Sequence, residues 1–160
     1  MSVKSETRFQ QWAYRIGRLI LGVVFIYAAV LKMASPKEFG DNIAAYQILP
    51  FAAINLLALG LPLFEFACGL LVLSGFFFRV GVLGLLGLLT VFVVATVTAL
   101  LRGLSVDCGC FGAHSWLNSD PWVVLIHDGI LLGIAVFLYG HDLRRRQREL
   151  VPPSAAWSPA

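Results

Sequence analysis

Two cysteines separated by a single glycine, Cys108-Gly109-Cys110, are the residues of this 160-residue chain best suited to chemistry. A disulfide across so short a spacing closes a very small ring, and strained disulfides are the labile ones that exchange readily. Glycine supplies the backbone freedom that such a turn requires. Because so small a ring constrains very little of the chain, the spacing favours thiol–disulfide exchange over a stabilising role.

Other interpretations of the cysteine pair stay open. The two thiols could bind a soft metal with Asp107 or His114 as a further ligand, remain unrelated thiols, or form a permanent bridge to another chain. We favour exchange and assign no metal site. Asp107 disfavours a thiolate at Cys108 and His114 favours one at Cys110. We therefore take Cys110 as the attacking thiol, with the reverse order left open.

The composition of the chain is that of a membrane protein. Hydrophobic residues make up 59% of it and charged residues only 13%, against about a quarter charged in soluble domains. This excludes a soluble globular domain and a disordered chain. We predict an all-α, four-transmembrane-helix bundle over residues 1–148, followed by a flexible cytoplasmic tail over 149–160. The predicted spans, each near the length of about 20 residues that a bilayer requires, are 12–33, 51–78, 80–101 and 121–139.

The basic residues predict an orientation in the membrane. With both termini in the cytoplasm, nine Lys and Arg residues fall inside and three outside, as the positive-inside rule requires. Cys108 and Cys110 then face outward from a bacterial cytoplasmic membrane, on the disulfide-permissive side. The basic run 144–148 fits anionic membrane lipid, and a nucleic-acid partner is disfavoured. The nine are Lys4, Arg8, Arg15, Arg18, Arg79, Arg144, Arg145, Arg146 and Arg148, and the three are Lys32, Lys37 and Arg102.

A short helix is predicted after the first span. Ser35 is placed as N-cap, Pro36 at the first helical position and Glu38 at the third, as in a capping box. Apolar residues then recur at helical spacing as far as Pro50. We expect an amphipathic helix that lies on the outer membrane surface. A signal peptide is the rival interpretation of the first span, but Lys32 occupies the place of the cleavage site.

Three ionisable residues are predicted to meet within the membrane beneath the cysteine pair. Lys32 lies near the outer end of the first span, and His127 and Asp128 lie about 9–10 Å below the outer end of the fourth. Charges in hydrocarbon need partners, so we predict a Lys32–Asp128 ion pair with His127 beside it. These residues would serve either as an acid–base group for thiolate or quinone chemistry or as a structural clasp.

The second and third spans carry further features. Glu65 is expected to pair with Arg18, and Cys68 is interpreted as a buried, inert side chain. Pro62 predicts a kink in the second span. The glycines at 81, 84 and 87 predict close helix packing, and the tight link around Arg79 predicts a hairpin of the second and third spans.

The stretch from Ser105 to Gly112 resembles the Cys-x-Cys-Phe-Gly signature of the methylamine-utilisation MauE family, which belongs with DoxX-like four-helix membrane proteins. The resemblance extends over roughly residues 12–140 and includes Lys32 and a Pro-x-x-Glu-x-x-x-Gly pattern starting at Pro62. It implies a membrane protein that helps to form or shuffle disulfides in exported redox proteins. For MauE itself, the client implied is the disulfide-rich small subunit of methylamine dehydrogenase.

The function expected from the sequence is therefore thiol–disulfide exchange at the outer face of the membrane. An exported thioredoxin-like protein or a disulfide-containing client would exchange electrons with Cys108 and Cys110. A quinone near Lys32, His127 and Asp128 is a candidate terminal partner. The second interpretation is a non-enzymatic membrane subunit or assembly factor of a redox complex, and the third is a soft-metal carrier.

Overall fold

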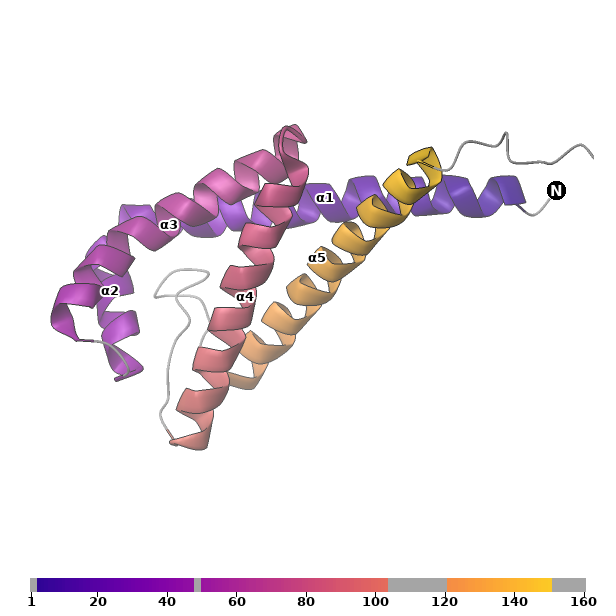
Figure 1. Cartoon of the computed structure of the whole chain (residues 1–160). Helices are drawn as coiled ribbons and strands as arrows, with labels where there is room; N and C mark the ends of the chain where they lie inside the picture. Colours follow the sequence, from indigo (N-terminus) through magenta and orange to yellow (C-terminus); the bar gives the residue numbers. More distant parts are fainter. Residues whose placement is uncertain (1–2, 48–49, 104–120, 151–160) are drawn as a thin grey trace, which may run out of the picture.

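The computed structural model of the chain describes residues 3–47, 50–103 and 121–150, and throughout these ranges the regular structure is helical (Figure 1). The order of elements is α1, α2, α3, α4 and α5. Their bounds are Val3–Ala34 for α1, Pro36–Ala45 for α2, Phe51–Ser74 for α3, Phe78–Leu101 for α4 and Pro121–Leu150 for α5.

Four of these helices are long and apolar enough to cross a membrane, namely Gln10–Ala34, Ala52–Ser74, Phe78–Leu101 and Trp122–Arg144. The predicted all-helical membrane architecture is thereby confirmed. The helix bounds differ from the predicted span bounds at two places. Helix α3 ends at Ser74, before residue 78, and α5 continues past residue 139 to Leu150. The basic run 144–148 is therefore helical, and residues 151–160 of the predicted tail lie outside the described ranges.

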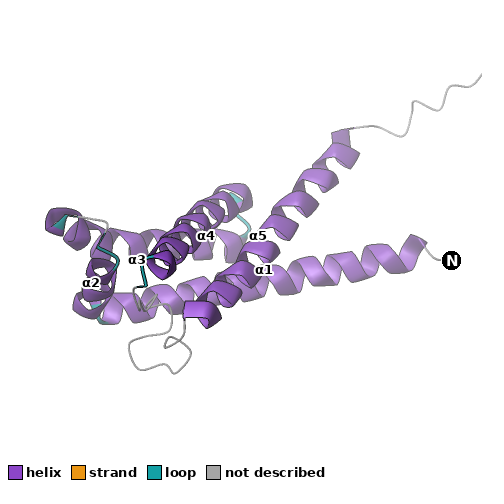
Figure 2. Ribbon diagram, turned by 90° about the horizontal axis from the view of Figure 1, so that it is seen from below, coloured by secondary structure: helices purple, strands orange, loops and turns teal. Residues whose placement is uncertain are grey.

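The helices pack as two crossing pairs. Helix α1 lies along α3, α4 lies along α5, and the second pair crosses the first in Figure 1. The turned view of Figure 2 shows α1 and α5 diverging toward the start of α1. We call the end at which α1 finishes and α5 begins the α2 end, and the other the N-terminal end. The core lies along the shared seam and includes Leu21, Phe25, Leu85 and Leu138.

Glycines let α1 approach α3 closely. A Cβ atom added at Gly69 would lie 3.0 Å from Cγ1 of Ile26 and 3.2 Å from the carbonyl oxygen of Gly22. Side chains at Gly22 and Gly69 would therefore force the two helices apart. Cys68, next to Gly69, is only 4% exposed and faces α4.

The predicted glycine packing of α4 is confirmed at two of its three positions. A Cβ at Gly81 would lie 3.0 Å from the carbonyl oxygen of Cys68, and one at Gly84 would lie 2.6 Å from its Sγ. No atom lies within 4 Å of a Cβ at Gly87, so this glycine does not serve packing against a described neighbour.

The predicted hairpin of α3 and α4 is also present. Gly75, with φ of 76°, adopts the left-handed conformation that ends α3, and its N–H donates to the carbonyl oxygen of Leu71 at 3.1 Å. Arg18 of α1 donates from Nη2 to the Leu73 carbonyl oxygen at 2.6 Å. That carbonyl is one of the last in α3, where cations are favoured. Helix α3 contains Pro62 and is curved in Figure 1.

Helix α2 begins as predicted but differs in its cap and its length. Ser35 precedes Pro36 at the first helical position, yet its side chain forms no capping hydrogen bond, so the predicted capping box was wrong. The helix ends at Ala45, short of Pro50. It packs against the first half of α3, where a Cβ at Gly40 would lie 3.6 Å from the Cβ of Ala58. Helix α2 thus continues the α1–α3 contact beyond the end of α1.

Candidate functional site

A buried ion pair joins α1 to α3. Nζ of Lys32 lies 2.7 Å from Oε1 and 2.9 Å from Oε2 of Glu65, so both carboxylate oxygens accept from one ammonium group. Both side chains are only 1% exposed. The predicted partners were wrong, because Lys32 bonds to Glu65 instead of Asp128, and Arg18 bonds to α3's last turn instead of to Glu65.

The depth of Lys32 explains this difference. Counting along each span placed Lys32 near the outer end of the first span, level with His127 and Asp128, and paired Glu65 with Arg18. Helix α2, however, continues along α3 beyond the end of α1, so the end of α1 lies level with the middle of α3, where Glu65 is found. The Lys32 ammonium also lies 5.1 Å from the ring centroid of Phe39 on α2 and 5.0 Å from that of Phe92 on α4. Such cation–π contacts strengthen when water is excluded.

Asp128 brings a second buried carboxylate to the site from α5. The residue is 3% exposed, and its Oδ1 lies 3.3 Å from Nδ1 of His127. Its Oδ2 is buried and has no hydrogen-bond partner among the residues that the structure describes. Buried polar atoms normally have one, so this oxygen marks a place for a proton or a small polar ligand. The His127 side chain is 28% exposed and connects the site to its surroundings.

A cavity of about 20 Å³ brings the four ionisable residues together. That volume holds about one water molecule, because a water needs roughly 10–15 Å³ measured in this way. It has no room for a quinone ring, which could reach only the exposed edge of His127. The quinone therefore stays a prediction. The lining residues are Val24, Phe25, Ala28, Lys32, Glu65, Leu89, Phe92, His127, Asp128 and Leu131.

The charges of the site do not cancel when every acid is ionised. One ammonium faces two carboxylates, which leaves one negative charge while His127 is neutral. An uncompensated charge in hydrocarbon is costly. The cluster is balanced once it holds one proton, either on a carboxyl group or on His127 as an imidazolium. The geometry is therefore suited to taking up and releasing a proton, and the residue that sequence reasoning left out of the site is Glu65.

The cysteines fall into two groups. Cys68 is buried against Gly84 and is a free thiol, in keeping with its interpretation as an inert core residue. Cys108 and Cys110, together with Asp107 and His114, lie outside the described residues. Their connection leaves α4 after Leu101 and enters α5 at Pro121, at the α2 end. Within the ranges 3–47, 50–103 and 121–150, no three His, Cys, Asp or Glu side chains are grouped so as to hold a metal ion.

The fold and site define an integral membrane protein of four apolar helices with a buried charge cluster between them. Residues 10–140 match the family of the methylamine utilisation protein MauE, and the chain belongs to this family. It is 31% identical over 127 residues to the methylamine utilization protein MauE of Paracoccus denitrificans. The match covers 78% of this chain and 66% of the relative, just under two thirds of its length. No solved structure matches the chain.

Proposed function

We propose that this MauE-family protein exchanges thiols and disulfides with exported proteins through Cys108 and Cys110. One observation supports the proposal most directly. Helix α5 is the first helix after the two cysteines in the sequence, and it carries His127 and the buried Asp128 near its start, so the charge cluster includes residues of the helix that directly follows the motif. MauE family membership and the Cys-Gly-Cys spacing point the same way.

The exchange is balanced in atoms and electrons. The thiolate of one cysteine attacks a client disulfide, forms a mixed disulfide and releases a client thiolate. The second cysteine then attacks its neighbour's sulfur, which releases the reduced client and leaves a Cys108–Cys110 disulfide. Two electrons pass to the client and two protons leave the dithiol, and the reverse sequence oxidises a client dithiol. The cluster of Lys32, Glu65, His127 and Asp128 would hold one of these protons.

The proposed setting follows the basic residues of the chain. Both termini lie in the cytoplasm, and the connection between α4 and α5 faces the outside of a bacterial cytoplasmic membrane. The partner is an exported thioredoxin-like protein or a client that contains disulfides. Periplasmic and extracellular compartments permit disulfides, so the two cysteines would meet oxidised partners there.

Trapping the mixed disulfide tests the proposal. Membranes from cells that express single variants are blocked with a thiol alkylator and separated on a non-reducing gel. With Cys110 as the attacking thiol, Cys108→Ser accumulates an adduct that reductant releases, whereas Cys110→Ser does not. The reverse pattern would exchange the two roles. Cys68→Ser is the matched control and behaves as the parent, because its thiol is buried between α3 and α4.

A second function is favoured by the hydrogen bonds of the Lys32–Glu65 pair. Both oxygens of Glu65 accept from the same ammonium, which is the geometry of a structural clasp between helices. In this alternative the protein is a non-enzymatic membrane subunit or assembly factor, and the cysteines form a fixed bridge. If neither single variant traps an adduct and the Cys108→Ser, Cys110→Ser double variant still supports client maturation, the exchange proposal is wrong and this one replaces it.

A further inference from the structure

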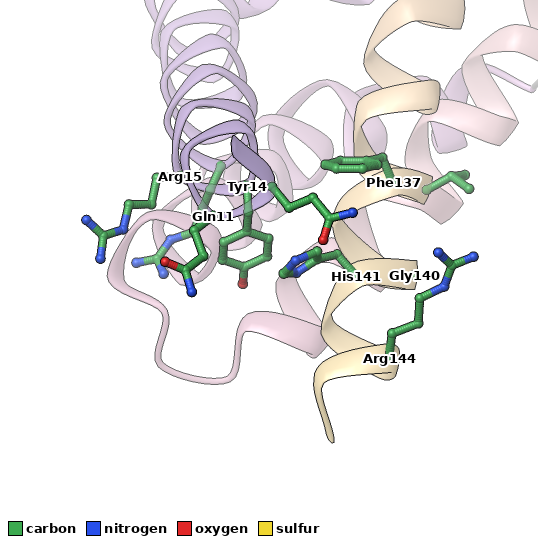
Figure 3. Close-up of a pocket in the computed structure, with 10 residues that line it drawn as sticks. Gln11, Tyr14, Arg15, Phe137, Gly140, His141 and Arg144 are labelled. Carbon is green, nitrogen blue, oxygen red and sulfur yellow. The ribbon is translucent and has the colours of Figure 1, made fainter. Parts of the chain in front are cut away.

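A basic groove lies between α1 and α5 at the N-terminal end, remote from the charge cluster at the other end. Its volume is about 770 Å³, within the range of 300–1,000 Å³ found for small-molecule sites. Figure 3 shows Gln11, Tyr14 and His141 between the two helices, with Arg15 and Arg144 on opposite rims. The groove is lined by Gln10, Gln11, Tyr14, Arg15 and Arg18 of α1 and by Val136, Phe137, Gly140, His141 and Arg144 of α5.

The arginines at this end differ in whether they already have a partner. Arg79 forms an ion pair with Asp142 at 2.7 Å, and Arg18 donates to the Leu73 carbonyl oxygen. Arg15 and Arg144 are exposed and form no ion pair within the described part of the chain. The groove thus has two positive rims with no counter-ion from the part of the chain that the structure describes.

The side chains that line the groove change from apolar to amide and basic toward the start of α1 and the end of α5, which is the pattern expected at the boundary between hydrocarbon and headgroups. Val136 and Phe137 form an apolar wall on the membrane side. Toward the end of the helices, the amide of Gln11 and the ring of His141 provide further polar groups, and Nδ1 of His141 is buried with no hydrogen-bond partner among the described residues.

We propose that this groove binds the headgroup of an anionic phospholipid. The phosphodiester lies between Arg15 and Arg144, whose long side chains can turn inward from the rims, and one acyl chain follows Val136 and Phe137 into the membrane. Basic pockets between transmembrane helices bind anionic headgroups by this combination of charge and depth. Arginine suits the role because its planar group donates two parallel hydrogen bonds to a phosphate.

Native mass spectrometry of the full-length protein in detergent tests the proposal with phosphatidylglycerol and phosphatidylcholine as probes. We expect one retained phosphatidylglycerol and no retained phosphatidylcholine. The Arg15→Gln, Arg144→Gln double variant should weaken this binding by about tenfold or more, as the loss of two basic contacts predicts. The matched control is Arg8→Gln with Arg146→Gln, which removes the same charge from exposed residues outside the groove.

A second variant tests the groove without changing its charge. A Cβ at Gly140 meets no atom within 4 Å, so Gly140→Phe can fill the groove without a clash in the helix pair. Gly133→Phe is its control, because Gly133 also has open space but does not line the groove. We expect Gly140→Phe to lose the retained lipid and Gly133→Phe to keep it.

Three results would overturn the proposal. The first is equal retention of phosphatidylcholine, and the second is equal loss in the Arg8→Gln, Arg146→Gln control, which would mean diffuse attraction. The third is displacement of the lipid by millimolar inorganic phosphate, which would make the groove a site for the free anion. None of these results depends on Cys108 or Cys110, so the lipid site and the exchange function fail separately.

Discussion

Lys32 of α1 and Glu65 of α3 face each other across 2.7 Å with both side chains 99% shielded, and each satisfies the other's charge. The two residues are 33 positions apart in the sequence but are in direct contact in the structure. Removing Lys32 leaves two carboxylates in hydrocarbon with no ammonium group beside them, whereas removing both members leaves only Asp128. The pair therefore stabilises the contact between the end of α1 and α3.

Substitution of the pair should show this dependence. Lys32→Met alone should lower the free energy of unfolding by about 3–5 kcal/mol, since it leaves the buried Glu65 and Asp128 without the ammonium group that faces them. Glu65→Leu alone should cost less, because Lys32 then still faces Asp128. The double variant should recover a large part of that loss. Unfolding in mixed detergent micelles measures all four proteins. Additive losses would show that the two side chains do not interact.

The Arg79–Asp142 pair provides a matched control for this experiment. Its N–O distance is also 2.7 Å, but its side chains are 36% and 18% exposed. The corresponding changes, Arg79→Met and Asp142→Leu, should cost only about 0–1 kcal/mol each in pair energy, because exposed pairs are weak. A similar cost for both pairs would contradict the role assigned to burial.

The number of helices could be predicted from the sequence because it depends on local composition. Stretches of about 20 apolar residues determine a membrane span without reference to any partner. The ends of the helices were less predictable. The apolar stretch of the fourth span ends at residue 139, whereas the helix continues through the arginines to Leu150. Hydropathy reports the thickness of the membrane, and a helix can continue into water beyond it.

The partners within the site could not be predicted from depth along each helix alone. The sequence indicated that Lys32, His127 and Asp128 lie at similar depths, and the structure brings them to one cavity. It did not indicate that α2 continues the contact of α1 with α3, and this shift moves Lys32 level with Glu65. Helix offset depends on packing of Gly22 against Gly69, which is a tertiary property.

The loss of stability on replacing a glycine of α4 should depend on the atoms that the added Cβ would contact. Gly84→Ala places a Cβ 2.6 Å from Sγ of Cys68 and should destabilise the protein by about 1–3 kcal/mol. Adding Cys68→Ala should recover much of that loss by removing the sulfur. Gly87→Ala is the control on the same helix and should be neutral or slightly stabilising, because alanine favours helix and meets no atom there. Thermal unfolding of the parent and the three variants measures these effects, and equal losses at Gly84 and Gly87 would contradict the packing.

The orientation in the membrane is a separate prediction. Cysteine labels introduced at Ser2 and Ser158 in a protein without its native cysteines should be inaccessible to an impermeant reagent in intact cells. Nine basic residues on the side of the termini against three on the other supply the physical reason. Lysed cells provide the control for reactivity. Labelling of either terminus from outside would invert the orientation and place Cys108 and Cys110 in the cytoplasm.

Asp128 should link the charge of the buried site to exchange. Asp128→Asn removes the carboxylate that lacks a counter-ion of its own, leaves the Lys32–Glu65 pair neutral overall, and should raise the free energy of unfolding by about 1 kcal/mol. If the cluster accepts a proton from the Cys108–Cys110 dithiol, the same change should slow reduction of a client disulfide about tenfold or more while adduct trapping in Cys108→Ser persists. His127→Gln keeps a polar side chain at the neighbouring position and separates the contribution of the imidazole. If the Asp128→Asn variant is more stable and exchanges at the parental rate, the cluster has only a structural role. If the variant is more stable but exchanges more slowly, the unbalanced charge contributes to the exchange chemistry.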